Sequence, residues 1–147
     1  MVKFGKEALE ATELLHELML AQKHAFHAAA KECGLSPQQL ATLWHLVPGE
    51  GMPMSAIAEL LVCDASNVTG IVDKLEARGL AQRGQGEDRR VKVLTLTALG
   101  EELRTSMRER LLSPPHWLVQ LTRDDQRALR DVLRRGLEVM RAGEKQP

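Results

Sequence analysis

The sequence predicts a mainly α-helical fold in which three short helices precede a small β-hairpin and long helices stand at both ends. Two observations predict it. Apolar residues recur at helical spacing in runs that begin near residues 14, 40, 68 and 129. Apolar and polar residues instead alternate between 91 and 97, which is typical of a strand. Breaks at 48–51 and 114–115, rich in proline or glycine, separate the helical segments.

Composition and charge limit the classes of protein to which the chain can belong. Its 147 residues suffice for one domain with a sizeable core, and no apolar run approaches the roughly 20 residues that cross a bilayer. The N-terminus lacks the apolar core of a signal peptide, so we expect a cytoplasmic protein. Formal net charge is zero, so any positive field for nucleic acid must be local. Aromatic residues make up 3%, too few for a platform that stacks single-stranded bases.

The first two helices are predicted from a broad apolar face and a capping motif. Residues 5–33 form one long helix with apolar side chains on more than one side, and Gly34 ends it. Ser36 can cap the next helix, with Pro37 at its first position and Gln39 completing a capping box. This second helix has four apolar side chains on one face: Leu40, Leu43, Trp44 and Val47.

Two further short helices follow the break at 48–51. The first has three apolar side chains on one face: Ile57, Leu60 and Leu61. Its start is poorly capped unless Ser55 serves as the cap. Asp64 is a good N-cap for the second helix, which we expect at 65–78. The buried stripe of this helix has helical spacing and consists of Val68, Ile71, Val72 and Leu75.

A hairpin and two longer helices complete the chain. Gly79 before Leu80 is typical of a helix stop, and strands are expected at 80–84 and 91–96 around a tip at 85–88. Thr97 starts a helix whose inward side chains are Leu99, Leu103, Met107 and Leu111. Pro114 and Pro115 must stop or kink that helix, and a capping box at 122–125 starts the last one. Its apolar side consists of Leu129, Val132, Leu133, Leu137 and Met140.

The helix at 65–78 has a surface suited to reading a groove of double-stranded DNA. In a helix-turn-helix the second helix enters the major groove with its N-terminal end. The residues opposite the apolar stripe are small or polar and are Ala65, Ser66, Asn67, Thr69, Gly70, Asp73 and Lys74. Asn67 can pair bidentately with adenine, and Gly70 permits close approach although it costs roughly 1 kcal/mol of helix propensity. The alternative is an ordinary amphipathic helix with a solvated polar face.

The hairpin tip adds a second candidate contact with DNA. Arg89 and Arg90 have no use in a core, and arginine is attracted to the negative potential of a narrow minor groove. Asp88 can hold the tip turn or brace an arginine through its carboxylate. The alternative is a charged surface turn, which is common in proteins.

The stretch from Ser36 to Gly100 resembles the winged helix-turn-helix of the multiple-antibiotic-resistance regulator (MarR) family. The residues that carry the resemblance are Ser66-Asn67-Val68-Thr69, Leu75-Glu76-Ala77-Arg78-Gly79-Leu80, and Asp88-Arg89-Arg90 followed by Leu94-Thr95-Leu96-Thr97 and Gly100. The resemblance implies that Arg90 enters the minor groove and that Asp88 supports it. Met54 departs from the family, which usually has a polar residue there.

The resemblance also implies domain organisation and partners. It implies one domain over 1–147, with a DNA-binding region at 36–96 and helical dimerisation regions at 5–33 and 97–142. The expected protein is a homodimeric repressor that binds a pseudo-palindromic operator and is released by a small molecule. By the same analogy an effector pocket would be lined by His16, Trp44, His45 and Trp117.

Other functions are less well supported by the residues. No phosphate loop, nucleophile elbow or dinucleotide fingerprint is present, so we expect neither an enzyme nor a cofactor. His24 and His27 lie one turn apart without further ligands, so no metal site is expected. Thiol-based redox sensing by Cys33 or Cys63 and a winged-helix adaptor that binds protein instead of DNA remain the alternatives.

Overall fold

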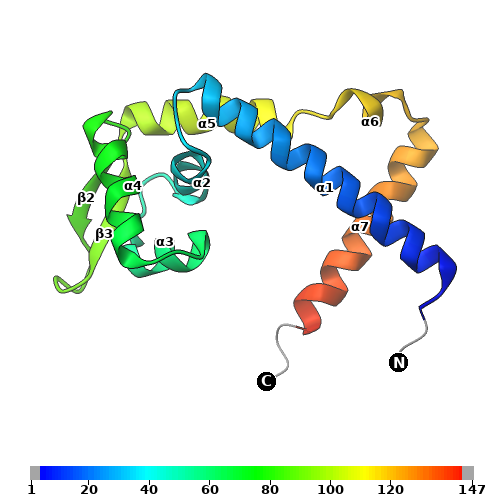
Figure 1. Cartoon of the computed structure of the whole chain (residues 1–147), viewed down its shortest axis with the longest axis horizontal. Helices are drawn as coiled ribbons and strands as arrows, with labels where there is room; N and C mark the ends of the chain where they lie inside the picture. Colours follow the sequence, from blue (N-terminus) through cyan, green and yellow to red (C-terminus); the bar gives the residue numbers. More distant parts are fainter. Residues whose placement is uncertain (1–3, 144–147) are drawn as a thin grey trace. The chain divides into compact units, whose positions relative to one another are not determined.

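The computed structural model describes residues 4–143, which form seven helices and three strands (Figure 1). The chain divides into two compact units, Met1–Leu111 and Leu112–Pro147. The first unit contains α1 (Lys6–Glu32), α2 (Pro37–His45), β1 (Met52–Pro53), α3 (Met54–Leu61), α4 (Ala65–Ala77), β2 (Ala81–Gln85), β3 (Lys92–Leu96) and nearly all of α5 (Ala98–Leu112). The second contains α6 (His116–Gln120) and α7 (Arg123–Gly143). The mainly helical fold with a small antiparallel sheet is the predicted one.

The caps of α1 and α2 confirm the sequence prediction. Gly34 has φ +65°, the left-handed conformation that ends α1. The Ser36 hydroxyl accepts a hydrogen bond from the Gln39 backbone at 3.2 Å, and the Ser36 backbone donates to the Gln39 side chain at 2.8 Å. This reciprocal box closes the first turn of α2. Only the last turns of α1 meet the core, through Ala29 and Ala30.

The start of α3 differs from the prediction. Ser55 does not cap the helix, because the N-cap is Pro53 and no side chain makes a capping hydrogen bond there. Pro53 belongs to β1, a two-residue strand that was not predicted. Met52 of β1 pairs with Leu94 of β3. The sheet therefore has three antiparallel strands in the order β1-β3-β2 instead of an isolated hairpin.

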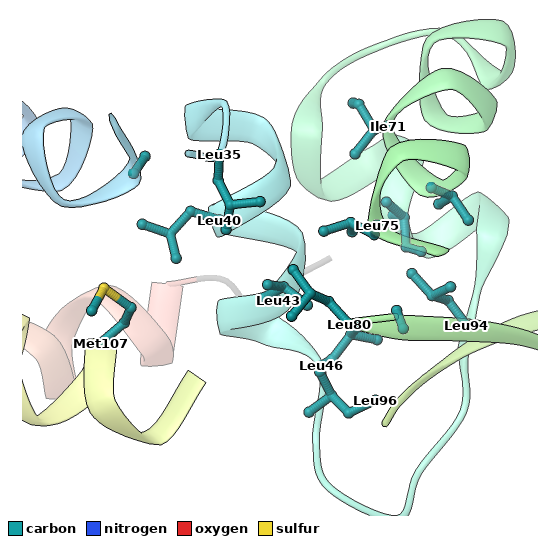
Figure 2. Close-up of a cluster of buried hydrophobic side chains, with 14 of the residues drawn as sticks. Leu35, Leu40, Leu43, Leu46, Ile71, Leu75, Leu80, Leu94, Leu96 and Met107 are labelled. Atoms are coloured by element: carbon teal, nitrogen blue, oxygen red, sulfur yellow. The ribbon is translucent and has the colours of Figure 1, made fainter. Parts of the chain in front are cut away.

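The core of the first unit lies between α2, α4 and the sheet. Figure 2 shows Leu43, Leu75 and Leu80 pointing toward one another, with Leu46 and Leu94 beside them. The whole predicted stripe of α4 is buried, and its members are Val68, Ile71, Val72 and Leu75. Burial of each such side chain contributes roughly 1.5–3 kcal/mol. This face holds α4 against the unit and leaves the opposite face of α4 exposed.

Helix α5 begins where the sequence predicts, and three of its four predicted inward side chains, Leu103, Met107 and Leu111, pack on the core. The Thr97 hydroxyl accepts from the Gly100 backbone at 3.1 Å and donates to Gly79 O at 2.6 Å. Gly100 is buried against this junction, and Met107 is 7% exposed. The prediction that Leu99 points inward is wrong, because Leu99 is 53% exposed. Contact of Gly100 with the backbone of Leu80 turns the preceding residue outward.

The second unit consists of a short helix and a long one. Pro114 and Pro115 end α5, and five residues then form α6, which was not predicted. The Thr122 hydroxyl accepts from the Asp125 backbone at 3.2 Å and so begins α7 at its predicted position. The predicted apolar side of α7 is uncovered in the single chain: Val132, Leu133, Leu137 and Met140 are each at least 45% exposed.

Among the described residues, no single helix is long and apolar enough to cross a membrane. The bent pair α3 and α4 meets the length and composition criterion when taken together.

Candidate nucleic-acid interface

Helix α4 presents a small, polar surface beside the N-terminus of α2. The predicted contact residues Ser66, Asn67, Thr69, Gly70 and Lys74 are all exposed. All of them except Thr69 lie with Ser36, Gln38 and Gln39 around a hollow of about 370 Å³. Thr69 is turned elsewhere, and its hydroxyl donates to Ala65 O of its own helix at 3.1 Å. The structure thus gathers Ser66, Asn67 and Lys74 in one place and separates Thr69 from them.

Gly70 sits in open space on this exposed face. A Cβ built on Gly70 would meet no atom within 4 Å. The fold of the chain therefore does not require glycine here. Glycine at this position lets another molecule come closer to the helix backbone than any side chain would.

The tip between β2 and β3 is a closed turn with two free arginines. The Val91 backbone donates to Asp88 O, and Gly86 donates to Val91 O, both at 2.9 Å. The Asp88 carboxylate accepts from the Arg90 backbone at 2.9 Å. Of the two roles left open for Asp88, the structure shows the first: it holds the turn. Arg89 and Arg90 are exposed, and their guanidinium groups form no ion pair within the described part of the chain.

A groove of about 720 Å³ runs between α3, α4 and the hairpin. Its charged lining residues are Asp73, Arg83, Arg90 and Lys92, and its apolar lining includes Met54 and Val91. Ser55 and Thr69 add hydroxyl groups. The predicted tip residue Arg90 and the predicted helix residue Thr69 therefore face one cleft, although they are far apart in the sequence.

The sequence analysis missed Arg83, which joins the two walls of this groove. Its Nη2 donates to Asp73 Oδ1 at 2.6 Å, its Nη1 to Glu76 Oε2, and its backbone to Glu76 Oε1 at 2.8 Å. The hydrogen bond with Asp73 raises the pKa of Arg83, burial opposes this rise, and the charges of Glu76 and Asp73 add to it. Asp73 and Glu76 are three residues apart on a helix, a spacing that places both on one face.

Arg78 fixes the other end of α4. Its Nη1 donates to Gly34 O at 2.7 Å and its Nη2 to Cys33 O at 2.9 Å. These carbonyls end α1, where a cation also suits the helix dipole. The exposed face of α4 is thus held by buried apolar side chains beneath it and by arginine contacts at Arg78 and Arg83.

The four candidate pocket residues have unequal surroundings. Trp44 is half-buried. The ring of Phe26 packs edge-on against the Trp44 ring, with 6.2 Å between the ring centroids. The Arg108 guanidinium lies 4.8 Å from the centroid of the Trp44 ring. Arg104 Nε donates to Trp44 O at 3.3 Å, and burial, with a smaller effect of Arg108, lowers the pKa of Arg104. His16 and His45 are exposed in the first unit, and Trp117 is 44% exposed in the second.

The cysteines and histidines show no metal-binding arrangement in residues 4–143, where no three potential ligands come together. Cys33 is half-buried, and its thiol donates to the Met107 sulfur at 3.3 Å. Cys63 is half-buried against the core.

Comparisons with known proteins agree with this geometry. Residues 34–91 match the sequence model described as the MarR family, and no match was found among curated proteins. MepR, a transcription regulator of the Staphylococcus aureus multidrug efflux pump MepA, is similar over 88% of this chain and 97% of its own, with 20% identity and a TM-score of 0.73. Transcriptional regulator Tm0710 from Thermotoga maritima is similar over 97% of this chain and 100% of its own, with 25% identity and a TM-score of 0.67. A mutant of S. aureus MepR bound to an oligodeoxyribonucleotide is similar over 94% of this chain and 99% of its own, with 20% identity and a TM-score of 0.61.

Proposed function

We propose that this chain is a homodimeric transcription regulator that binds double-stranded DNA by sequence, because residues 34–91 match the sequence model of the MarR family. The observation that carries the proposal is the groove in which the exposed side of α4 and the arginine tip face the same space. In this arrangement α4 is the recognition helix, which enters the major groove, and the β2–β3 hairpin is the wing, which reaches the minor groove. The mutant MepR is bound to an oligodeoxyribonucleotide, which supports DNA as the partner proposed for this chain.

Each candidate residue has a chemical role in this proposal. Asn67 reads a base edge, Ser66 approaches bases or phosphates, and Lys74 neutralises a phosphate. Arg90 enters the minor groove, Arg89 contacts the backbone beside it, and Asp88 keeps the tip turn closed. The regulator acts in the cytoplasm, and the proposal assigns the chain no catalytic step and no cofactor.

Selection of duplexes from a random-sequence pool tests the proposal. The wild-type protein is expected to enrich a pseudo-palindrome whose half-sites lie about one helical turn, roughly 10 base pairs, apart. Affinity for it should fall as salt rises, because bound phosphates release counterions. If no duplex is enriched even at low salt, the winged helix is a protein-binding adaptor instead.

Replacing Gly70 with alanine is expected to change stability and binding in opposite directions. Alanine in open helical space stabilises the protein by about 0.5–1 kcal/mol. The added methyl group, however, stands where the helix would approach base edges, so affinity for the selected duplex should fall about tenfold. Thermal unfolding and titration of the labelled duplex measure the two effects.

Gly136→Ala is the matched control for Gly70→Ala. Gly136 lies within α7, and its Cβ would also meet no atom within 4 Å. Because Gly136 lies on a proposed dimerisation helix, light scattering should first show the mass of the wild-type dimer. The variant should then gain similar stability and bind DNA as the wild type does. Equal affinities for Gly70→Ala and Gly136→Ala would exclude close approach at Gly70.

The homodimer in the proposal is supported by apolar surface that the single chain leaves uncovered. Helix α1 exposes apolar side chains along its first turns: Leu9, Leu14, Leu15, Leu18, Met19 and Leu20. In the second unit, α6 and α7 enclose an apolar groove of about 610 Å³ that contains Leu118, Leu129 and Leu133. Apolar patches of this extent are typical of interfaces, and a second copy would cover them symmetrically.

Leu133→Asp is expected to dissociate the dimer. It places a carboxylate in the α6–α7 groove, where pairing would bury it without a partner. Light scattering should then give the mass of one chain instead of two at micromolar concentration. Val47→Asp is the control, since Val47 is similarly exposed at 44% but lies outside the proposed dimerisation helices. If both variants remain dimeric, the pairing surface lies elsewhere.

The proposal also includes release of DNA by a small-molecule effector. Of the candidate residues His16, Trp44, His45 and Trp117, the first three belong to the first unit, where the effector would bind beside Trp44. The best-defined surroundings are those of Trp44: the Arg108 guanidinium lies over its indole ring, and Arg104 donates to its backbone carbonyl. Such surroundings favour an aromatic anion. Fluorescence of the two tryptophans during titration with aromatic carboxylates tests it, and unchanged DNA affinity in their presence would exclude effector release by this class.

A further inference from the structure

Arg83 is the residue through which strand β2 holds the recognition helix. Its two terminal nitrogens are both occupied by oxygens of α4: Nη1 by Glu76, and Nη2 by Asp73 at 2.6 Å and more weakly by Thr69 O at 3.4 Å. Its own backbone adds a bond to Glu76 at 2.8 Å. An arginine engaged in this way cannot also grip a phosphate with both terminal nitrogens.

The position of Arg83 in the sheet makes these contacts important for the wing. Arg83 pairs with Leu94 in the middle of the β2–β3 ladder. Strand β1 supports β3 only at Val93 and Leu94, so the hairpin from Gln85 outward has no third strand. The angle of the arginine tip relative to α4 therefore depends on contacts between β2 and α4, among which the Arg83 contacts are charged and bidentate.

The charge of Arg83 has a second effect on the same groove. Asp73 and Arg83 line it together with Arg90 and Lys92, which form no ion pair within the described residues. A bare carboxylate at Asp73 would repel a phosphate backbone entering this space. Arg83 lies against that carboxylate and cancels its charge where it faces the groove.

We infer that Arg83 is a positioning residue for DNA recognition: it sets the recognition helix and the wing at a fixed separation and neutralises Asp73, while contacting no DNA itself. This inference rests on the proposed function, because it gives a role to the separation of two DNA-reading elements. A helix and wing held in their bound arrangement lose less conformational freedom on binding, which raises affinity without any added contact.

Arg83→Met tests the inference on the duplex that the wild-type protein selects from a random-sequence pool. Affinity should fall at least about tenfold, while the slope of log affinity against log salt stays that of the wild type, since no phosphate contact is lost. Adding Asp73→Asn should restore part of the affinity, because it removes the uncovered carboxylate. A slope shallower by about 0.9, with no recovery in the double variant, would make Arg83 a phosphate contact and overturn the inference.

Arg110→Met is the matched control. Arg110 makes a bidentate ion pair with Glu32 in the same unit, away from the groove. The Arg110→Met variant shows how much the loss of one bidentate ion pair lowers the stability of the protein. If Arg110→Met and Arg83→Met lower the melting temperature and the affinity equally, Arg83 has only a structural role.

Amide hydrogen exchange without DNA separates failure of the inference from failure of the proposed function. Arg83→Met should speed exchange across 81–92 and in the first turns of α4, and Arg110→Met should not. Unchanged exchange in Arg83→Met would overturn the inference even if the wild type binds DNA. Faster exchange in a protein that enriches no duplex would instead leave Arg83 as a brace between helix and hairpin and refute the regulator assignment.

Discussion

Gly100→Ala is expected to destabilise the protein by about 3 kcal/mol or more, the effect of forcing a methyl group into rigid backbone. A Cβ on Gly100 would lie 1.8 Å from Leu80 O and 2.9 Å from the Leu80 carbonyl carbon. Because the obstacle is backbone, no side-chain rotation relieves the clash. The start of α5 would have to move away from β2.

That movement would break the junction between the end of α4, strand β2 and the start of α5. Thr97 donates through its backbone to Leu80 O at 3.2 Å and through its hydroxyl to Gly79 O at 2.6 Å. Both bonds depend on the close contact at Gly100. Thermal and urea unfolding measure the loss, which should lower the melting temperature by roughly 10 °C.

The open glycine Gly136 again provides the comparison for Gly100. Alanine at Gly136 has room and should leave the melting temperature unchanged or slightly higher. If Gly100→Ala were as stable as Gly136→Ala, the approach of α5 to Leu80 would be looser than the structure shows, and the fixed geometry of the wing would lose one of its supports.

Arg90→Ala is expected to weaken binding of the selected duplex by about 2 kcal/mol, roughly 30-fold in Kd. Arg90 is exposed at a closed turn, and its guanidinium forms no ion pair in the described residues, so it is free to enter a minor groove. The salt slope should also decrease by about 0.9 if one phosphate contact is lost with it. Equilibrium titrations at several salt concentrations measure both quantities.

Removing an arginine far from the hairpin tip distinguishes a direct contact of the tip with DNA from attraction of DNA by the overall charge of the protein. Arg135 is an exposed arginine of α7, remote in sequence from the wing, and Arg135→Ala changes net charge by the same amount. It should bind nearly as the wild type does. Equal losses for Arg90→Ala and Arg135→Ala would mean that the tip attracts DNA only through overall charge, and the minor-groove role would be wrong.

Features that rest on a few neighbouring residues could be predicted from the sequence. The capping box of Ser36 and Gln39 and the left-handed Gly79 depend on local backbone chemistry, and both occur. The buried stripe of α4 follows from helical spacing, so the exposed side that carries Ser66, Asn67 and Lys74 follows as its complement. The candidate interface on α4 was predictable for this reason.

Features that depend on distant partners could not be predicted in the same way. Strand β1 exists because Met52 pairs with Leu94, which follows α3 and α4 in the sequence. A strand of two residues has no periodicity from which it could be predicted. Spacing placed Leu103, Met107 and Leu111 correctly, but contact between Gly100 and Leu80 turns Leu99 outward at the start of α5. The role of Arg83 was indicated only weakly, by two carboxylates, Asp73 and Glu76, spaced to lie on one face of a helix. That spacing points to Arg83 only once β2 is known to fold back along α4.

Hydroxyl-radical footprinting of the selected duplex tests most directly whether two copies place paired helices and arginine tips on one DNA. The account predicts two symmetric protected regions about one helical turn apart, each flanked by minor-groove protection that disappears with Arg90→Ala. A single protected region, or flanking protection that is unchanged in Arg90→Ala, would contradict it.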